Sequence, residues 1–371
     1  MIINETKKQT TNEKVKPKLT KKKIAKRIAI SFGTFLFCVI FTVMSACFVI
    51  SYGPSATLRD MLVVSAKQAS ATKWVPHLFL SKAKVQEIVD SSFKIDSDTV
   101  DINDIDKGAT ADIWDKNPDG IFYETIQAPT SKAYVMLIKD PSRVKVGLAS
   151  DNLTAGGKIY DVAAKYNAAA AINGGEFEDI GGFGDGSTPM GLTYSMGKCV
   201  TSSSGGRTFI GFDKNNRLVV KNSLSKEKAE ELGVRDGVCF KYKNVLINQD
   251  GESVKIHYRN SDNSVAQRTA IGQANDGTVI FVVTDGRTAS SIGATYNDVI
   301  NIMLSYGAVN AGMLDGGSSS VMYYRDYIQK YNVDTSKLDS NQKKGVVCQY
   351  RAFSEPRKIP TFFIVTGEGQ K

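Results

Sequence analysis

Two turns of the same kind, each at the end of an apolar run, constrain this chain more than any other feature. One is Asn173-Gly174-Gly175, which follows four alanines and an isoleucine, and the other is Asp315-Gly316-Gly317, which follows Met313-Leu314. Before each run comes a helix-like segment that contains an Asp-Val pair. Glycine lets a backbone approach another group closely. We therefore predict a pseudo-repeated helix–strand–Asx-Gly-Gly unit whose two strand ends converge on one site.

The N-terminal part of the chain predicts a membrane anchor. Residues 28–52 contain no charged side chain, are rich in Ile, Phe and Val, and are long enough to cross a bilayer as a helix. Residues 1–27 carry ten basic and two acidic residues, a net charge of +8. The positive-inside rule makes them a cytoplasmic tail and places the rest of the chain outside the cell membrane. A cleaved signal peptide is the alternative, since Ser45-Ala46-Cys47 resembles a processing site.

Beyond the tail the chain is close to neutral. The other 344 residues hold 37 basic and 36 acidic residues, a net charge of +1. A nucleic-acid-binding domain usually shows a concentrated basic surface. We therefore expect no nucleic-acid partner.

Residues 53–120 are expected to separate the anchor from the globular part. Apolar positions over 55–90 recur at helical spacing with an interruption at Pro76, which predicts a helical stalk and a possible surface for self-association. Residues 91–120 hold eight aspartates and few large apolar side chains, which favours a solvated linker over a calcium loop. Three cysteines follow the anchor, so at most one disulfide can form among them, with its pairing open: Cys199, Cys239 and Cys348.

Residues 121–371 are expected to form the folded domain. Short runs of β-branched and aromatic residues alternate there with turn signals and a few helical patterns. The predicted strands are 133–138, 144–148, the run into Asn173, 208–212, 218–221, 270–272, 279–283 and 361–365, and the predicted helices are 160–166, 226–232 and 296–306. This pattern predicts the α+β class, with mixed or antiparallel sheets and packed helices.

The signatures of the common hydrolases are absent from the sequence. It contains no G-x-S-x-G, P-loop or H-E-x-x-H motif, and its only histidines are His77 and His257. Arginines stand out instead: Arg268 precedes and Arg287 follows a predicted hairpin, so both are expected at one edge of it. Two guanidinium groups there would bind an oxyanion such as phosphate. The alternative is a structural pair, for example Arg287 with Asp285.

Five motifs in chain order within residues 121–368 resemble the phosphodiester glycosidase family. They are Asn173-Gly174-Gly175-x-Phe177, Pro189-Met190-Gly191, Arg268-Thr269-Ala270-Ile271-Gly272, Asp285-Gly286-Arg287 and Leu314-Asp315-Gly316-Gly317-Ser318-Ser319. The family includes the uncovering enzyme that removes N-acetylglucosamine from a sugar phosphodiester on lysosomal enzymes, and bacterial exopolysaccharide biosynthesis proteins. Two departures are Glu176, where an aromatic or small residue is common, and Gly-Gly-Ser in place of Gly-Gly-Gly.

The resemblance implies an extracytoplasmic enzyme that hydrolyses the C1–O bond of a sugar-1-phosphodiester in an envelope or exported polysaccharide, without a cofactor. The leaving group is a phosphomonoester whose second pKa is about 6, so it departs readily if arginines stabilise its charge. A carboxylate must then stabilise the oxocarbenium-like centre or activate water, and Asp315 is the first candidate. The expected catalytic residues are Asp315, Arg268, Arg287, Asp285 and Glu176. The expected substrate-binding residues are Asn173, Gly174, Gly175, Gly316, Gly317, Ser318 and Ser319.

Three points stay open at the level of sequence. Glu178, Asp179 and Asp185 carry carboxylates that calcium accepts, but their spacing matches no known calcium loop. The chain could bind an anionic envelope glycan without catalysis. It could also transfer a sugar between polymers, with an acceptor hydroxyl in place of water.

Overall fold

The computed structural model describes residues 21–68, 72–92, 95–105, 111–182, 185–203, 206–259, 264–286, 288, 291–348 and 354–367. The chain divides into two compact units, Met1–Ala56 and Thr57–Lys371. In the first unit, helix α1 (Lys21–Tyr52) begins within the basic cluster and continues through the whole apolar segment. It is long and apolar enough to cross a membrane, a property that an N-terminal signal sequence shares.

The second unit begins with a small helical pair. Helices α2 (Ala56–Gln68) and α3 (Lys82–Ser92) flank the short 3-10 helix η1 (Val75–Leu78), which contains Pro76. Val63 and Val64 of α2 are buried with Val85 and Ile88 of α3 in a separate small core. Helices are present where the sequence predicts them, with the interruption at Pro76, whereas the role as a stalk and the self-association stay predictions.

The acidic segment that follows is partly a strand rather than a linker. Strand β1 (Ile95–Asp101) pairs antiparallel with β12 (Ser253–Arg259) over its whole length. Asp98 and Asp101 are exposed, and charged side chains are well tolerated on such an edge strand. The sheet of the globular part therefore starts at residue 95, earlier than the expected boundary at 121.

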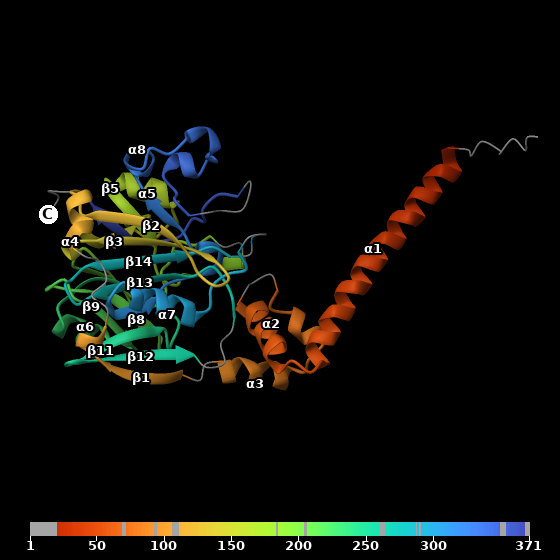
Figure 1. Cartoon of the computed structure of the whole chain (residues 1–371), viewed down its shortest axis with the longest axis horizontal. Coiled ribbons are helices and arrows are strands. Elements are labelled where there is room, and N and C mark those ends of the chain that lie inside the picture. The colour runs from red at the N-terminus through yellow and green to blue at the C-terminus, as the bar shows by residue number, and fades with distance from the viewer. Residues whose placement is uncertain are drawn as a thin grey trace, which may run out of the picture. The chain divides into compact units, whose positions relative to one another are not determined.

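The largest sheet has eight strands in the order β1-β12-β11-β15-β13-β14-β3-β2, and all its neighbours are antiparallel. Figure 1 shows β2, β3, β14 and β13 in succession, with β12 and β1 at the opposite edge. Its other strands are β2 (Ile121–Gln127), β3 (Lys132–Ile138), β11 (Val245–Asp250), β13 (Thr269–Ala274), β14 (Val279–Thr284) and β15 (Ala308–Met313). Every residue of β13 and β14 is buried, and helix α7 (Tyr296–Ser305) packs on this sheet.

Two smaller antiparallel sheets complete the domain. The four-stranded sheet, β16-β5-β17-β4, consists of β4 (Val144–Leu148), β5 (Ala168–Asn173), β16 (Met322–Tyr324) and β17 (Thr361–Thr366). The five-stranded sheet, β7-β6-β10-β8-β9, consists of β6 (Leu192–Ser195), β7 (Lys198–Ser202), β8 (Thr208–Asp213), β9 (Leu218–Asn222) and β10 (Val234–Phe240). Phe212 of β8 and Phe363 of β17 meet edge to face with centroids 6.4 Å apart, which joins the two sheets in one core.

The remaining helices are short. They are α4 (Ala111–Lys116), α5 (Ile159–Lys165), α6 (Lys226–Glu231), α8 (Tyr327–Lys330), and the 3-10 helices η2 (Ile102–Asp104), η3 (Pro141–Arg143), η4 (Ile180–Gly182), η5 (Gly317–Ser319), η6 (Thr335–Lys337) and η7 (Gln342–Lys344). Each strand and helix predicted from the sequence is present, and the α+β class with antiparallel sheets is confirmed.

The predicted order of helix, strand and Asx-Gly-Gly turn is confirmed in both repeated units. Helix α5 leads into β5, and α7 leads into β15. Each helix ends at a tyrosine followed by a residue with left-handed backbone, Asn167 with φ 47° and Gly307 with φ 78°. The two strands belong to different sheets, however. The repeated units therefore meet only at their Asx-Gly-Gly ends.

Candidate active site

The two Asx-Gly-Gly turns are joined by direct hydrogen bonds. Asn173 Nδ2 donates to Asp315 O at 2.7 Å, and Asp315 N donates to Gly174 O at 3.2 Å. The other side-chain atom of the amide, Asn173 Oδ1, accepts from Thr269 Oγ1 at 2.8 Å and from Val321 N at 3.1 Å. The predicted convergence is confirmed. Because Asn173 is fully buried and bonded at both ends, it positions the Asp315 loop, which differs from the expected contact with substrate.

The glycines of the first turn allow close packing between strands. A Cβ atom on Gly174 would lie 2.4 Å from Thr361 Oγ1, and one on Gly175 would lie 2.3 Å from Cys239 O. Gly174 N donates to Thr361 O at 2.9 Å. These contacts hold the turn against β17 and β10, so the glycines serve the protein's own packing rather than the approach of a ligand.

The glycines of the second turn also use their N–H groups within the protein. Gly316 N donates to Asp315 Oδ1 at 2.9 Å, and Gly317 N donates to Gln267 O at 2.8 Å. Only Gly317 needs the left-handed backbone, with φ 63°. The backbone N–H groups of Gly316 and Gly317 are therefore bonded within the protein, although the two glycines were expected to bind substrate.

Asp315 has the electrostatic character of a reactive carboxyl group. Burial raises the pKa of Asp315 above its ordinary value, while a hydrogen bond with Ser319 and the positive charges of Lys241 and Arg357 act in the opposite direction. The residue is nevertheless only partly buried, so a ligand can reach it. A carboxyl group in this setting is a candidate acid, base or charge stabiliser.

Arg357, which the sequence analysis did not single out, lies beside Asp315. Its Nη1 donates to Ser319 Oγ at 3.1 Å, and its Nη2 donates to Asp179 Oδ2 at 3.2 Å. The guanidinium lies over the Phe177 ring, 5.7 Å from its centroid, and 22% of the side chain is exposed. Arg357 is therefore held on three sides and still faces solvent.

A signal for Arg357 did exist in the sequence. It lies four residues before β17, and β17 pairs with β5 so that Phe362 is opposite Asn173. Pairing the predicted strand 361–365 with the predicted strand that ends at Asn173 would have brought Arg357 to the site.

The structure gives Arg268 a different role from the expected anion clamp. Arg268 Nε donates to Ala294 O at 3.1 Å, and Nη2 donates to Ser264 O at 2.9 Å and to Ser264 Oγ at 3.0 Å. The guanidinium lies 4.3 Å from the Tyr296 ring centroid, and the residue is only 5% exposed. Arg268 therefore holds the segment before α7.

Asp285 and Arg287 are the two other catalytic residues predicted near the β13–β14 hairpin. Asp285 is 3% exposed and accepts a hydrogen bond from Tyr134 Oη at 2.9 Å, so its carboxylate faces the interior. Arg287 lies outside the described residues. The expected pairing of Arg268 with Arg287 therefore stays a prediction.

Glu176 remains a candidate at the edge of the site. It lies two residues after Gly174, and its Oε2 accepts from Arg207 Nε at 2.8 Å. Its side chain is 22% exposed. Of the two serines, Ser318 is exposed, whereas Ser319 is buried against Arg357.

The possible calcium ligands are used by the protein in other ways. Asp179 pairs with Arg357, and Asp185 Oδ1 accepts from Lys358 N at 2.9 Å. Within the part of the chain that the structure describes, no three His, Cys, Asp or Glu side chains are grouped to hold a metal ion.

One family model matches the part of the chain that carries this loop site. The model of the family described as phosphodiester glycosidase matches residues 166–366, which is more than half of the chain and includes both Asx-Gly-Gly turns. The chain therefore belongs to the phosphodiester glycosidase family.

One solved structure supports the fold. The catalytic domain of zebrafish N-acetylglucosamine-1-phosphodiester alpha-N-acetylglucosaminidase, auto-inhibited by its pro-peptide, aligns with a TM-score of 0.50 and 19% identity, over 73% of this chain and 88% of that one. A putative exported protein from Burkholderia pseudomallei K96243 aligns less well, with a TM-score of 0.44 and 16% identity over 64% of this chain and 74% of that one.

A curated relative matches over a short stretch. The SPbeta prophage-derived protein YomE of Bacillus subtilis (strain 168) is 49% identical over 53 residues, which is 14% of this chain and 8% of that protein. The likeness therefore covers only a small part of that relative.

Proposed function

We propose that this protein hydrolyses a sugar-1-phosphodiester of an envelope or exported polysaccharide outside the cytoplasm. The observation that carries the proposal is the Asp315 carboxyl, whose pKa is raised by burial and which lies near the positive charge of Arg357. Membership in the phosphodiester glycosidase family supports the reaction class. The apolar helix α1, preceded by a basic tail, supports the membrane location.

In the proposed reaction the bond between C1 of the sugar and the phosphate oxygen breaks. The phosphate leaves as a monoester, and the guanidinium of Arg357 stabilises its charge. Asp315 stabilises the positive charge that develops at C1 or removes a proton from the attacking water. The water oxygen ends on C1, and its proton leaves through Asp315.

We expect Arg357→Lys to lower kcat/KM by roughly 10- to 100-fold, in line with the loss of one charge-stabilising donor. Lysine keeps the charge, but it cannot donate to both Ser319 and Asp179 in the planar geometry of a guanidinium. Arg325→Lys is the matched control, because Arg325 is an exposed arginine that pairs with its neighbour Asp326. Equal effects of the two changes would contradict the role of Arg357.

Replacing Lys241 should shift the pH dependence of kcat/KM. As a base or charge stabiliser, Asp315 must be ionised, so activity should fall as the pH falls through its pKa. Lys241→Met removes a positive charge that lowers the pKa of Asp315, so this acid limb of kcat/KM should move to higher pH. Lys243→Met is the control. A limb that stays in place, or moves to lower pH, would exclude Asp315 as the titrating group.

The function is tested with the full-length protein in detergent and a synthetic sugar-1-phosphodiester. Release of free sugar and phosphomonoester in equal amounts is the expected result. Binding without turnover would make the protein a glycan-binding protein instead. A new glycoside that forms only when an acceptor sugar is added would identify a transferase.

A separate experiment tests on which side of the membrane the domain lies. Protease added to intact cells should remove the domain that begins at Thr57 and leave a membrane-bound fragment that contains the basic tail. Protection of the domain until the cells are lysed would reverse the proposed orientation.

A further inference from the structure

A polar pocket lies beside the first residues of strand β10, whereas the Asn173-Gly174-Gly175 turn contacts the last part of that strand. Its volume is ≈ 260 Å³, and it is lined by Ser142, Lys145, Met196, Gly197, Asn216, Arg235 and Asp236. Arg235 stands at the start of β10, while Cys239 O accepts from Glu176 N four residues further on. Four residues of a strand span about 13 Å, so the pocket is separate from the candidate active site.

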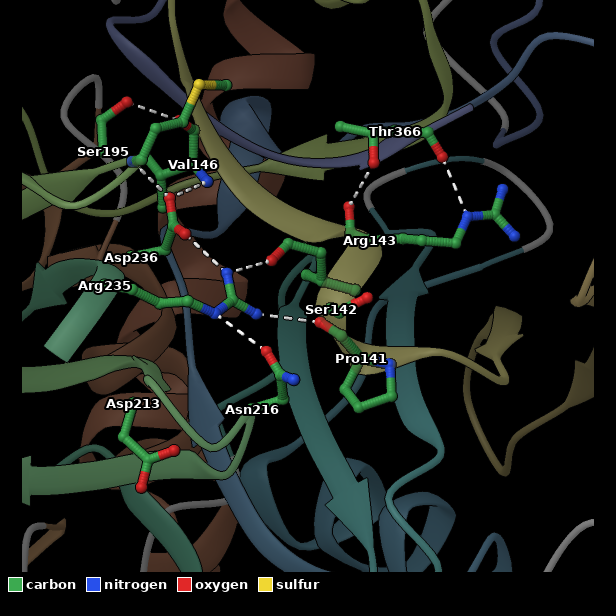
Figure 2. Close-up of polar contacts among 12 residues, drawn as sticks. Pro141, Ser142, Arg143, Val146, Ser195, Asp213, Asn216, Arg235, Asp236 and Thr366 are labelled. Atoms are coloured by element: carbon green, nitrogen blue, oxygen red, sulfur yellow. Dashed lines mark hydrogen bonds and ion pairs between the residues drawn. The ribbon is translucent and has the colours of Figure 1, made fainter. Parts of the chain in front are cut away.

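The acidic group in this pocket is already neutralised. Asp236 is 1% exposed, and its Oδ1 accepts from Val146 N and Met196 N, both at 2.8 Å. Its Oδ2 accepts from Arg235 Nη1 at 2.6 Å, as Figure 2 shows. Two other carboxylates lie nearby. Asp140 is exposed and accepts from Ser142 N at 2.9 Å. Asp213, which Figure 2 also shows, is 4% exposed and is paired with Arg217, whose Nε donates to Asp213 Oδ2 at 3.2 Å.

The guanidinium of Arg235 is held by four hydrogen bonds, and one of its N–H groups remains available to a ligand. Its Nε donates to Asn216 Oδ1 at 3.1 Å, its Nη1 also donates to Val144 O at 2.8 Å, and its Nη2 donates to Pro141 O at 2.9 Å (Figure 2). These bonds and the one to Asp236 use four of the five N–H groups of a guanidinium. One N–H of Nη2 is left over.

Three more donors line the same pocket. In the described part of the chain, Lys145 Nζ, Asn216 Nδ2 and Ser142 Oγ donate to no protein acceptor, and the amide of Asn216 has its oxygen committed to Arg235. The pocket thus combines an ammonium group, a guanidinium N–H, an amide and a hydroxyl from three separate segments. Several donors with a net positive charge suit the oxygens of a tetrahedral anion.

We propose that this pocket binds a phosphate group, and that the phosphate belongs to an anionic glycan chain for which the pocket is a second contact. The phosphate site stands on the pocket's own donors, whereas the identity of the polymer rests on the proposed function. The volume of the pocket exceeds that of a bare phosphate, so it leaves room for the group attached to it. The pocket then holds a polymer on the protein without taking part in bond cleavage.

The test is calorimetric titration of inorganic phosphate into the full-length protein in detergent, with wild type and two variants. Asn216→Asp keeps the acceptor for Arg235 Nε and tolerates the left-handed backbone at φ 62°, but replaces the donor with a negative charge. Lys145→Met removes the ammonium group. Each should weaken one class of phosphate site by about tenfold or more.

Matched controls are Asn215→Asp, one residue along the same turn, and Lys221→Met, an exposed lysine of β9. Both should bind phosphate as the wild type does. Phosphate binding that is unchanged in Asn216→Asp and Lys145→Met, or that is lost entirely in Arg357→Lys, would overturn the proposal. Hydrolysis of a small soluble phosphodiester should be unaffected in Asn216→Asp, which separates this test from that of the proposed function.

Discussion

Replacing Asp315 with asparagine is expected to lower kcat by about a thousandfold, while the fold and the binding of substrate persist. Asparagine has the same shape, and its oxygen can still accept the hydrogen bond from Gly316 N. It cannot carry the negative charge that stabilises an oxocarbenium-like centre or the basicity that activates water. Steady-state kinetics with a sugar-1-phosphodiester, together with thermal unfolding, measure both parts of this expectation.

Glu176→Gln is the comparison that decides between the two carboxylates. Glu176 is paired with Arg207 and partly exposed, so its loss should reduce activity much less. Asp315→Asn with activity within about threefold of wild type, beside a collapse in Glu176→Gln, would transfer the role to Glu176.

Asn173→Ala is expected to lower the free energy of unfolding by about 4 kcal/mol and to abolish activity. The change leaves Asp315 O, Thr269 Oγ1 and Val321 N without their hydrogen-bond partner in the interior. Each buried group left unpaired costs roughly 1–3 kcal/mol. Urea unfolding followed by near-ultraviolet circular dichroism measures the difference.

Two further variants sharpen this prediction. Asn215→Ala, at an exposed turn position, should leave stability unchanged. Asn173→Asp keeps the acceptor for Thr269 and Val321 but buries a carboxylate against Asp315 O, so it should also be strongly destabilising. A loss below about 1 kcal/mol in Asn173→Ala would show that the amide does not join the two turns.

The sequence predicted the strands that carry continuous apolar runs, and it missed those whose charged residues have partners far away in the chain. Strand β10 contains Arg235 and Asp236, which looks unlike a buried strand until Val146 N and Met196 N are seen to bond the carboxylate. Strand β1 carries several aspartates because it is a sheet edge. Such pairings depend on tertiary contacts that local periodicity does not contain.

The sequence predicted that the two turns meet, but it did not predict which contacts the side chains around them make. The convergence of the two turns followed from their position at strand ends, and the structure confirms it through Asn173 and Asp315. The direction of a side chain follows from strand register, where a shift of one residue reverses the face. Local periodicity therefore predicts neither the contact of Arg268 with Tyr296 nor the pairing of β17 with β5 that brings Arg357 to the site.

The central claim is that water replaces the phosphate on C1 of a sugar. Hydrolysis of a sugar-1-phosphodiester by the full-length protein in ¹⁸O-labelled water, followed by mass spectrometry of both products, tests it most directly. We predict that the label appears in the free sugar and not in the phosphomonoester. Label in the phosphomonoester would show cleavage of the P–O bond and would contradict the assignment of Asp315 and Arg357 to a glycosidase reaction.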